Sequence, residues 1–270
     1  MAPNFVQYGF AHEPLGNLIC SAWGVSYSSP SEAMPGIIAP DAHVEFVFQL
    51  GVPSVTSLNG IERNSPSAMI FALRRGTLAL KTSGTNTIIA FRVAPLVASV
   101  ILNNPLTECW NHPVALAELI GAEAHTLLAR IAAVSLDEVA PVLEAWITSR
   151  LADWDADHKR ELALQNHLLW GVVHESMGAL ADDLGFTTRT LRRHSERYAG
   201  LSPKQVAMSG RLLRSCVALR DHRDKSIADI SHRLGFNDQA AFTNAFRNHV
   251  GMTPAAFRGE SIVYCEGARN

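Results

Sequence analysis

The sequence has few cysteines and no long apolar run. Its cysteines, Cys20, Cys109, Cys216 and Cys265, are dispersed along the chain. This dispersion excludes a zinc-type cysteine pair and a disulfide framework. The apolar runs are shorter than the roughly 20 residues that cross a bilayer, and the first residues lack the charged-then-apolar order of a secretory signal. We therefore expect a cytoplasmic chain with no membrane partner.

Motifs of enzyme active sites are also missing. The sequence has no Ser/His/Asp motif and no glycine-rich phosphate loop. We therefore expect no enzyme, with no catalytic residue, no cofactor and no metal.

Charge is scarce overall but unevenly placed. Charged residues make up 18% of the chain and apolar residues 47%, which predicts packed cores. The 270 residues correspond to about two domains. The formal net charge is −2, yet residues 189–258 hold 13 of the 23 Lys/Arg and only 5 of the 25 Asp/Glu. That segment carries +8 and the remainder −10, a division typical of an acidic domain joined to a nucleic-acid-binding one.

One pattern occurs twice in the last third of the chain. Residues 177–186 and 227–236 both end in Leu-Gly-Phe, and each is followed by Gly-x-Ser/Thr-Pro, at 200–203 and 251–254. Each copy predicts a helix, a glycine turn and a second helix, because serine, threonine and aspartate cap helix starts while glycine ends helices cheaply. The expected N-caps are Ser176, Thr187, Ser202, Ser226, Asn237 or Asp238, and Thr253, and the expected closing glycines are Gly185, Gly200, Gly235 and Gly251.

The second helix of each copy has two faces. Phe242, Ala245 and Phe246 form an inward stripe in the second copy, as do Leu191 and Tyr198 in the first. A helix-turn-helix places its second helix in the DNA major groove, where Arg, Gln and Asn read base edges. A long helix from Pro203 to about Arg220 is expected to join the copies. The expected DNA-binding residues are Thr187, Thr188, Arg189, Arg192, Arg193, Lys204, Asn237, Gln239, Ala240, Thr243, Asn244 and Arg247, with further phosphate contacts from Arg211 and Arg214.

The last 100 or so residues resemble the DNA-binding module of the AraC/XylS family of bacterial transcription regulators. The resemblance is carried by Ile227-Ala228 to Leu234-Gly235-Phe236, by Phe246-Arg247 and by Gly251-x-Thr253-Pro254-x-x-Phe257-Arg258. It implies double-stranded DNA and RNA polymerase as partners and a role as an activator. The family usually has an aromatic residue at Ser195, so we expect the first recognition helix to be packed less firmly.

Residues 1 to 94 read as mainly β, because short apolar runs alternate with Gly, Pro, Asn and Ser clusters. They predict a small barrel or sandwich. Leu15–Trp23, Pro40–Phe46 and Phe91–Pro95 resemble an AraC-type sensor half, which implies a cupin-like barrel that binds a small effector. The expected strands are Leu18–Val25, Val44–Leu50, Ala68–Leu73, Thr77–Lys81 and Thr87–Val93.

Two side-chain groups in this half could carry chemistry. His43 and Glu45 share a strand face, but the second histidine of a cupin metal motif is missing, so a polar position is the favoured interpretation. Several aromatic residues could line an apolar ligand pocket or belong to an ordinary core. They are Trp23, Phe46, Phe48, Phe71 and Phe91.

Beyond Pro95 the periodicity becomes helical, with helices expected at Leu96–Leu102, Ala115–Ala133 and Leu136–Leu151. The resemblance allows these helices to form a homodimer contact, and packing against the barrel is the alternative. Residues 152–158 read as a linker before a helix from Lys159 to Val173. The predicted fold is thus α+β, with a β-rich sensor domain at 1–155 and an all-α domain of two helix-turn-helix units at 156–262.

Two other functions stay open from the sequence. One is a regulator with no small effector. The other is a cupin-like or DNA-repair enzyme fused to a DNA-binding module, which the missing histidine pair and the dispersed cysteines disfavour.

Overall fold

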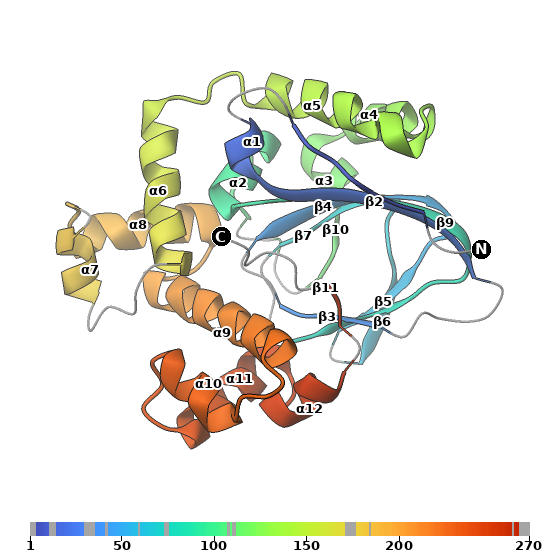
Figure 1. Ribbon diagram of the computed structural model, residues 1–270. Helices are drawn as coiled ribbons and strands as arrows, with labels where there is room; N and C mark the ends of the chain where they lie inside the picture. Colours follow the sequence, from blue (N-terminus) through green and yellow to red (C-terminus); the bar gives the residue numbers. More distant parts are fainter. Residues whose placement is uncertain are drawn as a thin grey trace.

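The computed structural model describes residues 4–10, 15–29, 36–40, 43–58, 60–72, 76–106, 109, 112–170, 177–183, 185–260 and 262–264. The fold is α+β: a β-rich half with helices over one side, followed by a helical half (Figure 1). Three expected positions lie outside the described residues. They are the helix cap Ser176, the helix end Val173 and the strand end Leu73.

The larger sheet has the strand order β1-β2-β9-β4-β7-β10. Its central strands β2, β9 and β4 pair antiparallel, with Glu45 opposite Arg92 and Phe46 opposite Phe91. These strands carry the densest β-branched and aromatic runs, which fit a pleated, half-buried surface. Its strands are β1 (Asn4–Gln7), β2 (Ile19–Ser29), β4 (Val44–Gly51), β7 (Ala68–Phe71), β9 (Gly84–Val93) and β10 (Val114–Ala115).

The smaller sheet has the order β11-β3-β8-β5-β6. The five strands expected from the sequence are confirmed as β2, β4, β7, β8 and β9. The expectation missed the short or polar strands, for example β6, in which all four residues are exposed. The strands of this sheet are β3 (Gly36–Ile38), β5 (Val55–Leu58), β6 (Ile61–Asn64), β8 (Leu78–Lys81) and β11 (Ile262–Tyr264).

The aromatic residues of the β-rich half divide between two cores. Phe46, Phe48 and Phe91 lie under the helices, where the Phe46 and Phe91 rings stack with centroids 4.5 Å apart. Trp23 and Phe71 belong to the cluster on the opposite face. Of the two interpretations that the sequence left open, core packing is therefore the one that the clusters favour: the five residues do not share one face, because alternate positions of a strand face opposite sides of the sheet.

Helices cover the outer face of the larger sheet (Figure 1). The expected helix Ala115–Ala133 is two helices, because Gly121 at φ +63° interrupts it. The expected helix Leu136–Leu151 begins with a 3₁₀ turn that Ser135 and Glu138 cap reciprocally. The elements are α1 (Leu15–Leu18), α2 (Pro95–Leu102), α3 (Leu116–Ile120), α4 (Glu123–Ala132), η2 (Leu136–Glu138) and α5 (Val139–Arg150).

The second half is helical. Its first helix starts at Ala156, earlier than expected, because Asp155 accepts a hydrogen bond from the His158 amide at 3.0 Å. The linker between the halves is accordingly shorter than residues 152–158. The helices are α6 (Ala156–Trp170), α7 (Met177–Asp183), α8 (Thr188–Ala199), α9 (Pro203–Asp221), α10 (Ile227–Arg233), α11 (Gln239–Val250) and α12 (Pro254–Gly259).

The two halves contact each other through backbone and core. The amides of Gly76 and Thr77 donate to the carbonyls of His249 and Val250 at 2.6 and 3.0 Å. Strand β11 runs parallel to β3, and Ala39 is buried in the core around α9, α10 and α11. The second helix-turn-helix unit is therefore docked on the smaller sheet. The sequence did not predict this contact, which depends on backbone pairing between distant residues.

Candidate nucleic-acid interface

The second unit, α10 and α11, has the geometry that its capping residues predict. The Ser226 hydroxyl accepts from the Asp229 amide at 3.0 Å, and Asp238 accepts from the Ala241 amide at 2.6 Å. Gly235 makes the turn at φ +73°, a conformation that glycine adopts without strain. These contacts fix where the recognition helix α11 begins.

Three phenylalanines hold α11 in place. Phe242, Phe246 and Phe257 are fully buried, and their rings meet edge to face at centroid distances of 5.4–5.5 Å. The other side of α11 faces solvent: Gln239, Ala240, Asn244 and Arg247 are exposed, as is Asn237 before the helix, and Thr243 is half-buried. The predicted base-reading residues of this unit thus share one accessible surface.

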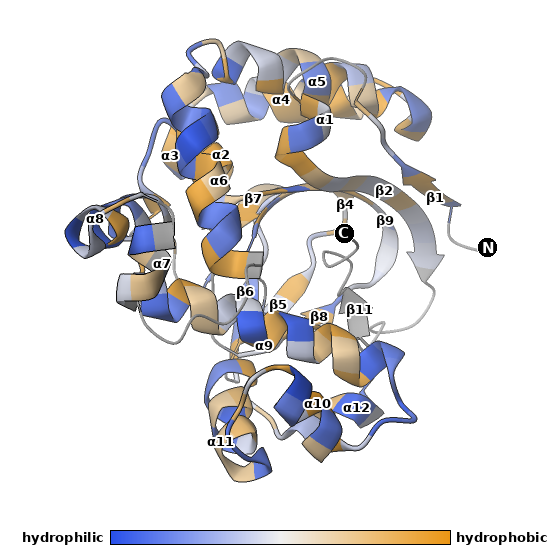
Figure 2. Ribbon diagram, turned by 60° about the vertical axis from the view of Figure 1, so that its left-hand side comes forward, coloured by the Kyte–Doolittle hydropathy of each residue, from blue (hydrophilic) through white to orange (hydrophobic). Residues whose placement is uncertain are grey.

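The first unit presents a more basic surface on α8. The Thr187 hydroxyl accepts from the Thr190 amide at 3.1 Å and starts the helix, with Thr188 exposed beside it. Arg189, Arg192 and Arg193 are exposed, and hydrophilic residues cover much of this helix (Figure 2). The Arg192 Nε donates to Glu196 at 2.7 Å, and this bond raises the pKa of the guanidinium. Arg189 and Arg193 are therefore the more available arginines of the predicted set.

The core of the first unit is built without the aromatic residues of the second. Ser195 is buried, and its hydroxyl donates to the Leu201 carbonyl at 2.6 Å. A cavity of about 10 Å³ adjoins Ser195 and is also lined by Val206 and by Leu96 of α2. Helix α2 of the first half thus packs beside Ser195 in the core of the first unit.

A polar cluster flanks this core. His194 Nδ1 lies 2.9 Å from the Glu161 carboxylate, and the Gln165 side chain accepts from the Leu96 amide at 2.9 Å. Burial, followed by a hydrogen bond with Glu161, raises the pKa of Tyr198 to about 12. Polar contacts thereby join the first unit to α6, and another joins α6 to α2.

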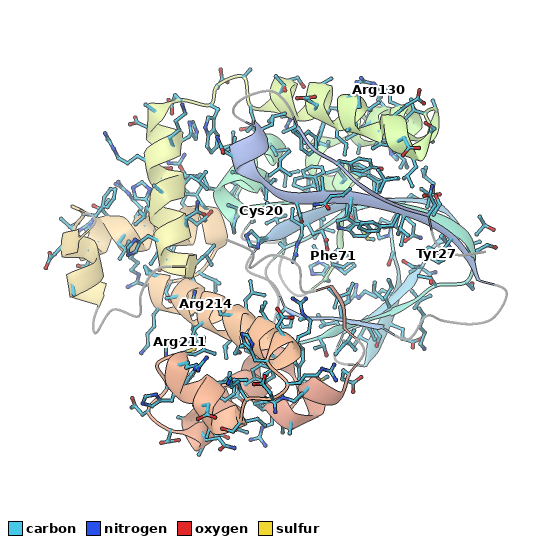
Figure 3. All side chains as sticks on the ribbon, viewed as in Figure 1. Cys20, Tyr27, Phe71, Arg130, Arg211 and Arg214 are labelled. Carbon is cyan, nitrogen blue, oxygen red and sulfur yellow. The ribbon has the colours of Figure 1, made fainter. Side chains whose placement is uncertain are left out.

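Helix α9 connects the units, and two of its arginines serve the fold. Arg214 donates to the Leu169 carbonyl at the end of α6, and the Arg211 guanidinium lies 4.9 Å from the centre of the Phe236 ring (Figure 3). Burial lowers the pKa of both groups. Both arginines are half-buried, so of the three residues expected to contact phosphates only Lys204, at the start of α9, is exposed.

The β-rich half has its own polar cluster on the face opposite the helices. His43 and Glu45 are buried, and Glu45 lies 3.9 Å from Arg92. The thiol of exposed Cys20 shares a hydrogen bond with His43, and Figure 3 places it near the end of the sheet. Among the described residues, no group of three or more His, Cys, Asp or Glu is arranged to hold a metal ion, and no described helix is long and apolar enough to cross a membrane.

Arg197 was not among the predicted site residues. It is exposed on α8 and lies over the Tyr198 ring at 5.0 Å from its centre. Its spacing of four residues from Arg193 places it on the same side of the helix, and this was the signal that could have identified it.

The sequence matches a known domain over this interface. Residues 180–260 match the family HTH_18, described as a helix-turn-helix domain. The HTH-type transcriptional activator RhaS of Escherichia coli O9:H4 (strain HS) is 34% identical over 80 residues, which cover 30% of this chain and 28% of RhaS. RhaS of Salmonella arizonae is 32% identical over 95 residues, which cover 35% of this chain and 33% of that RhaS. The chain thus matches about a third or less of the length of these curated relatives.

Solved structures with a similar arrangement include ToxT from Vibrio cholerae O395, at 11% identity and a TM-score of 0.47, covering 90% of this chain and 98% of ToxT. A transcriptional regulator from Chromobacterium violaceum, described as an AraC-type DNA-binding domain-containing protein, is 27% identical with a TM-score of 0.33. The match covers 37% of this chain and 87% of that one. The family match, the repeat and the geometry of the two units identify residues 180–260 of this chain as a helix-turn-helix domain.

Proposed function

We propose that this chain is a sequence-specific DNA-binding transcription regulator that acts in the cytoplasm together with RNA polymerase. The observation that carries the proposal is the pair of recognition helices, α8 and α11, whose exposed polar faces are connected by the single helix α9. In such an arrangement the two helices enter successive major-groove segments on one side of the duplex, about 34 Å apart.

The contacts divide into two kinds. Arg189 and Arg193 in α8 and Gln239 and Asn244 in α11 read base edges, since their side chains offer paired donors and acceptors. Lys204 and the helix N-termini bind phosphates, and these contacts supply affinity that falls as salt rises. The remaining predicted residues, Thr187, Thr188, Arg192, Asn237, Ala240, Thr243 and Arg247, lie on or beside the same surfaces.

The first half acts as the sensor in this proposal. A small effector bound there alters how the second unit sits on the smaller sheet, or how two chains associate as a homodimer. The docking through Gly76 and Thr77 supports such coupling, because a change in the sheet reaches α11 through direct hydrogen bonds.

Selection of bound sequences from random duplexes, with footprinting of the selected site at near-physiological salt, tests the proposal. Protection of one DNA face across two adjacent major-groove segments is expected. Weak binding that is indifferent to sequence, with or without candidate effectors, would overturn the base-reading role.

Variants sharpen this test. Gln239→Ala should cost about 1–3 kcal/mol at one base position only. Lys204→Ala should weaken binding to all sequences and reduce the salt dependence. Gln7→Ala, an exposed glutamine on β1, is the matched control and should change neither.

A further inference from the structure

A large open cleft lies where the helices of the first half meet the first recognition helix. Its volume is about 690 Å³, within the range of small-molecule sites. One wall comes from the ends of α2 and α5. The other comes from α6 and α8, two helices that lie next to each other in Figures 1 and 2. Charged and polar side chains dominate its lining, chiefly Asn103, Asn104, Arg150, Asp153, His158 and Arg197.

The wall from the first half favours a positively charged group. Helices α2 and α5 both end there, and the C-terminal end of a helix carries a partial negative charge. Asp153 adds a full negative charge just beyond α5 and is exposed. Asn103 and Asn104 add amide side chains, whose oxygens accept from an ammonium group.

The opposite wall favours a negatively charged group. Arg197 projects from α8 and is exposed, with its guanidinium carbon 5.0 Å from the centre of the Tyr198 ring. Its planar guanidinium can bind a carboxylate through two parallel hydrogen bonds.

The other charges of the cleft are already paired. Arg150 donates to the Ile101 carbonyl at 2.6 Å and to Glu123 at 3.2 Å, and His158 lies 2.7 Å from Asp155. Within the part of the chain that the structure describes, Arg197 and Asp153 form no ion pair. The cleft therefore offers one available cation, from α8, and one available anion, from the segment that follows α5.

We propose that this cleft binds a small zwitterion, a free α-amino acid, with its carboxylate on Arg197 and its ammonium on Asp153. A ligand that carries only a negative charge would be attracted by Arg197 and repelled by Asp153, and a ligand that carries only a positive charge would meet the reverse. The amino-acid side chain would lie against Val100 and Pro105, the apolar part of the lining.

Such a ligand would connect the two halves, since α2 and α5 belong to the first and α8 to the first helix-turn-helix unit. Its effect on DNA binding rests on the proposed function above. The occupancy of the cleft does not.

Calorimetric titration of the full chain with each standard free amino acid tests the site. One or a few amino acids should bind, whereas their methyl esters, which lack the carboxylate, and their N-acetyl forms, which lack the ammonium, should not. Arg197→Gln and Asp153→Asn should each weaken binding by about tenfold or more, because each removes a charge-assisted contact. The controls are Arg160→Gln and Asp157→Asn, an exposed ion pair on α6 outside the cleft, and they should bind normally.

Absence of binding by every amino acid, or equal binding of the esters and N-acetyl forms, would overturn the proposal. Normal binding by both cleft variants would overturn it as well. If either variant loses its cooperative thermal transition, the comparison of free and blocked amino acids on the native chain decides alone.

A separate measurement of affinity for the selected DNA, with and without the amino acid, distinguishes the two proposals. Calorimetric binding without sequence-specific DNA binding would reject the regulator but keep the site. Specific DNA binding without any amino-acid binding would reject the site only.

Discussion

At the scale of the residue, Gly210 has the least room for a side chain of the glycines compared in the helical half. A Cβ atom on Gly210 would lie 2.1 Å from the Leu169 carbonyl oxygen, so α9 crosses α6 at backbone contact. Gly210→Ala should destabilise the chain by about 1–3 kcal/mol, because the rigid backbone of α6 has to move to admit the methyl group. Thermal unfolding of the purified variant measures this loss.

Gly259→Ala is the matched control for that variant. Gly259 also lies in a helix, yet a Cβ there would meet nothing within 4 Å, so its unfolding temperature should stay the same or rise slightly. Equal stability of the two variants would contradict the close packing of α9 on α6.

Cys20 provides a second prediction at this scale. Desolvation of the thiol by the surrounding protein raises its pKa, but the hydrogen bond to His43 and the electrostatic influence of His43 and Arg92 more than offset this, so the pKa lies below its ordinary value. The thiolate is the reactive form, and a lowered pKa means more thiolate at neutral pH. A free cysteine is half-ionised near pH 8.5. The rate at which iodoacetamide alkylates Cys20 should therefore reach its half-maximum at a pH below about 8.5.

The chain contains internal controls for that measurement. Cys109 and Cys216 are buried and should remain unmodified in the folded protein, and Cys265, outside the described residues, is replaced by serine. His43→Gln should move the alkylation midpoint to higher pH. A midpoint in the native chain at or above that of free cysteine would refute the assigned cluster.

At the scale of the element, helix α2 has two separate tasks. Val97 packs into the core beneath the helices of the first half, while Leu96, fully buried, lines the cavity beside Ser195 in the first helix-turn-helix unit. The second unit fills its own core with Phe242, Phe246 and Phe257. The core of the first unit instead includes a side chain from the first half of the chain.

Leu96→Ala should therefore loosen α8 more than the rest of the molecule. The substitution enlarges a cavity and should cost about 2–4 kcal/mol, and amide hydrogens of α8 should exchange faster than those of α11. Val97→Ala is the control: it should destabilise the first half without a preference for α8. Equal acceleration in α8 and α11 would show that Leu96 does not support the first unit specifically.

The same comparison shows what the sequence can predict about elements. Ser226, Asp238 and Gly235 form the caps and the turn through contacts within a few residues, so the sequence alone predicts them. Strands β4 and β9 are predicted by their many β-branched and aromatic residues. Leu96 looks like any other apolar helix residue, since its partner Ser195 lies far away in the chain. Likewise the cleft with Arg197 and Asp153 exists only once α5 and α8 are brought together.

At the scale of the whole molecule, the docking of the second unit leaves the proposed base-reading face of α11 exposed. Gln239 and Asn244 remain exposed while the far end of α11 is held by Gly76 and Thr77. Docking therefore fixes the orientation of the unit and does not cover it. Any control of DNA binding through this contact would act on the spacing between α8 and α11.

Strand β11 lies at one edge of the smaller sheet and follows α12 in the chain, so it can be deleted without removing any helix of the second unit. Its pairing with β3 is parallel, with Ile262 opposite Ile37 and Tyr264 opposite Ile38. A chain that stops after Glu260 loses these bonds, whereas a chain that stops after Tyr264 keeps them. Loss of a few backbone hydrogen bonds, each contributing about 0.5–1.5 kcal/mol, should weaken docking by about 1–3 kcal/mol.

Hydrogen exchange at the Gly76 and Thr77 amides reports that change, because both donate to carbonyls at the end of α11. Exchange should accelerate in the chain ending at Glu260 and stay unchanged in the chain ending at Tyr264. Global unfolding would accelerate exchange in the central strands β4 and β9 too, so protection there separates undocking from loss of the fold. If Gly76 and Thr77 stay equally protected in both chains, β11 plays no part in holding the second unit, and the contacts of Ala39 and of residues 76 and 77 suffice.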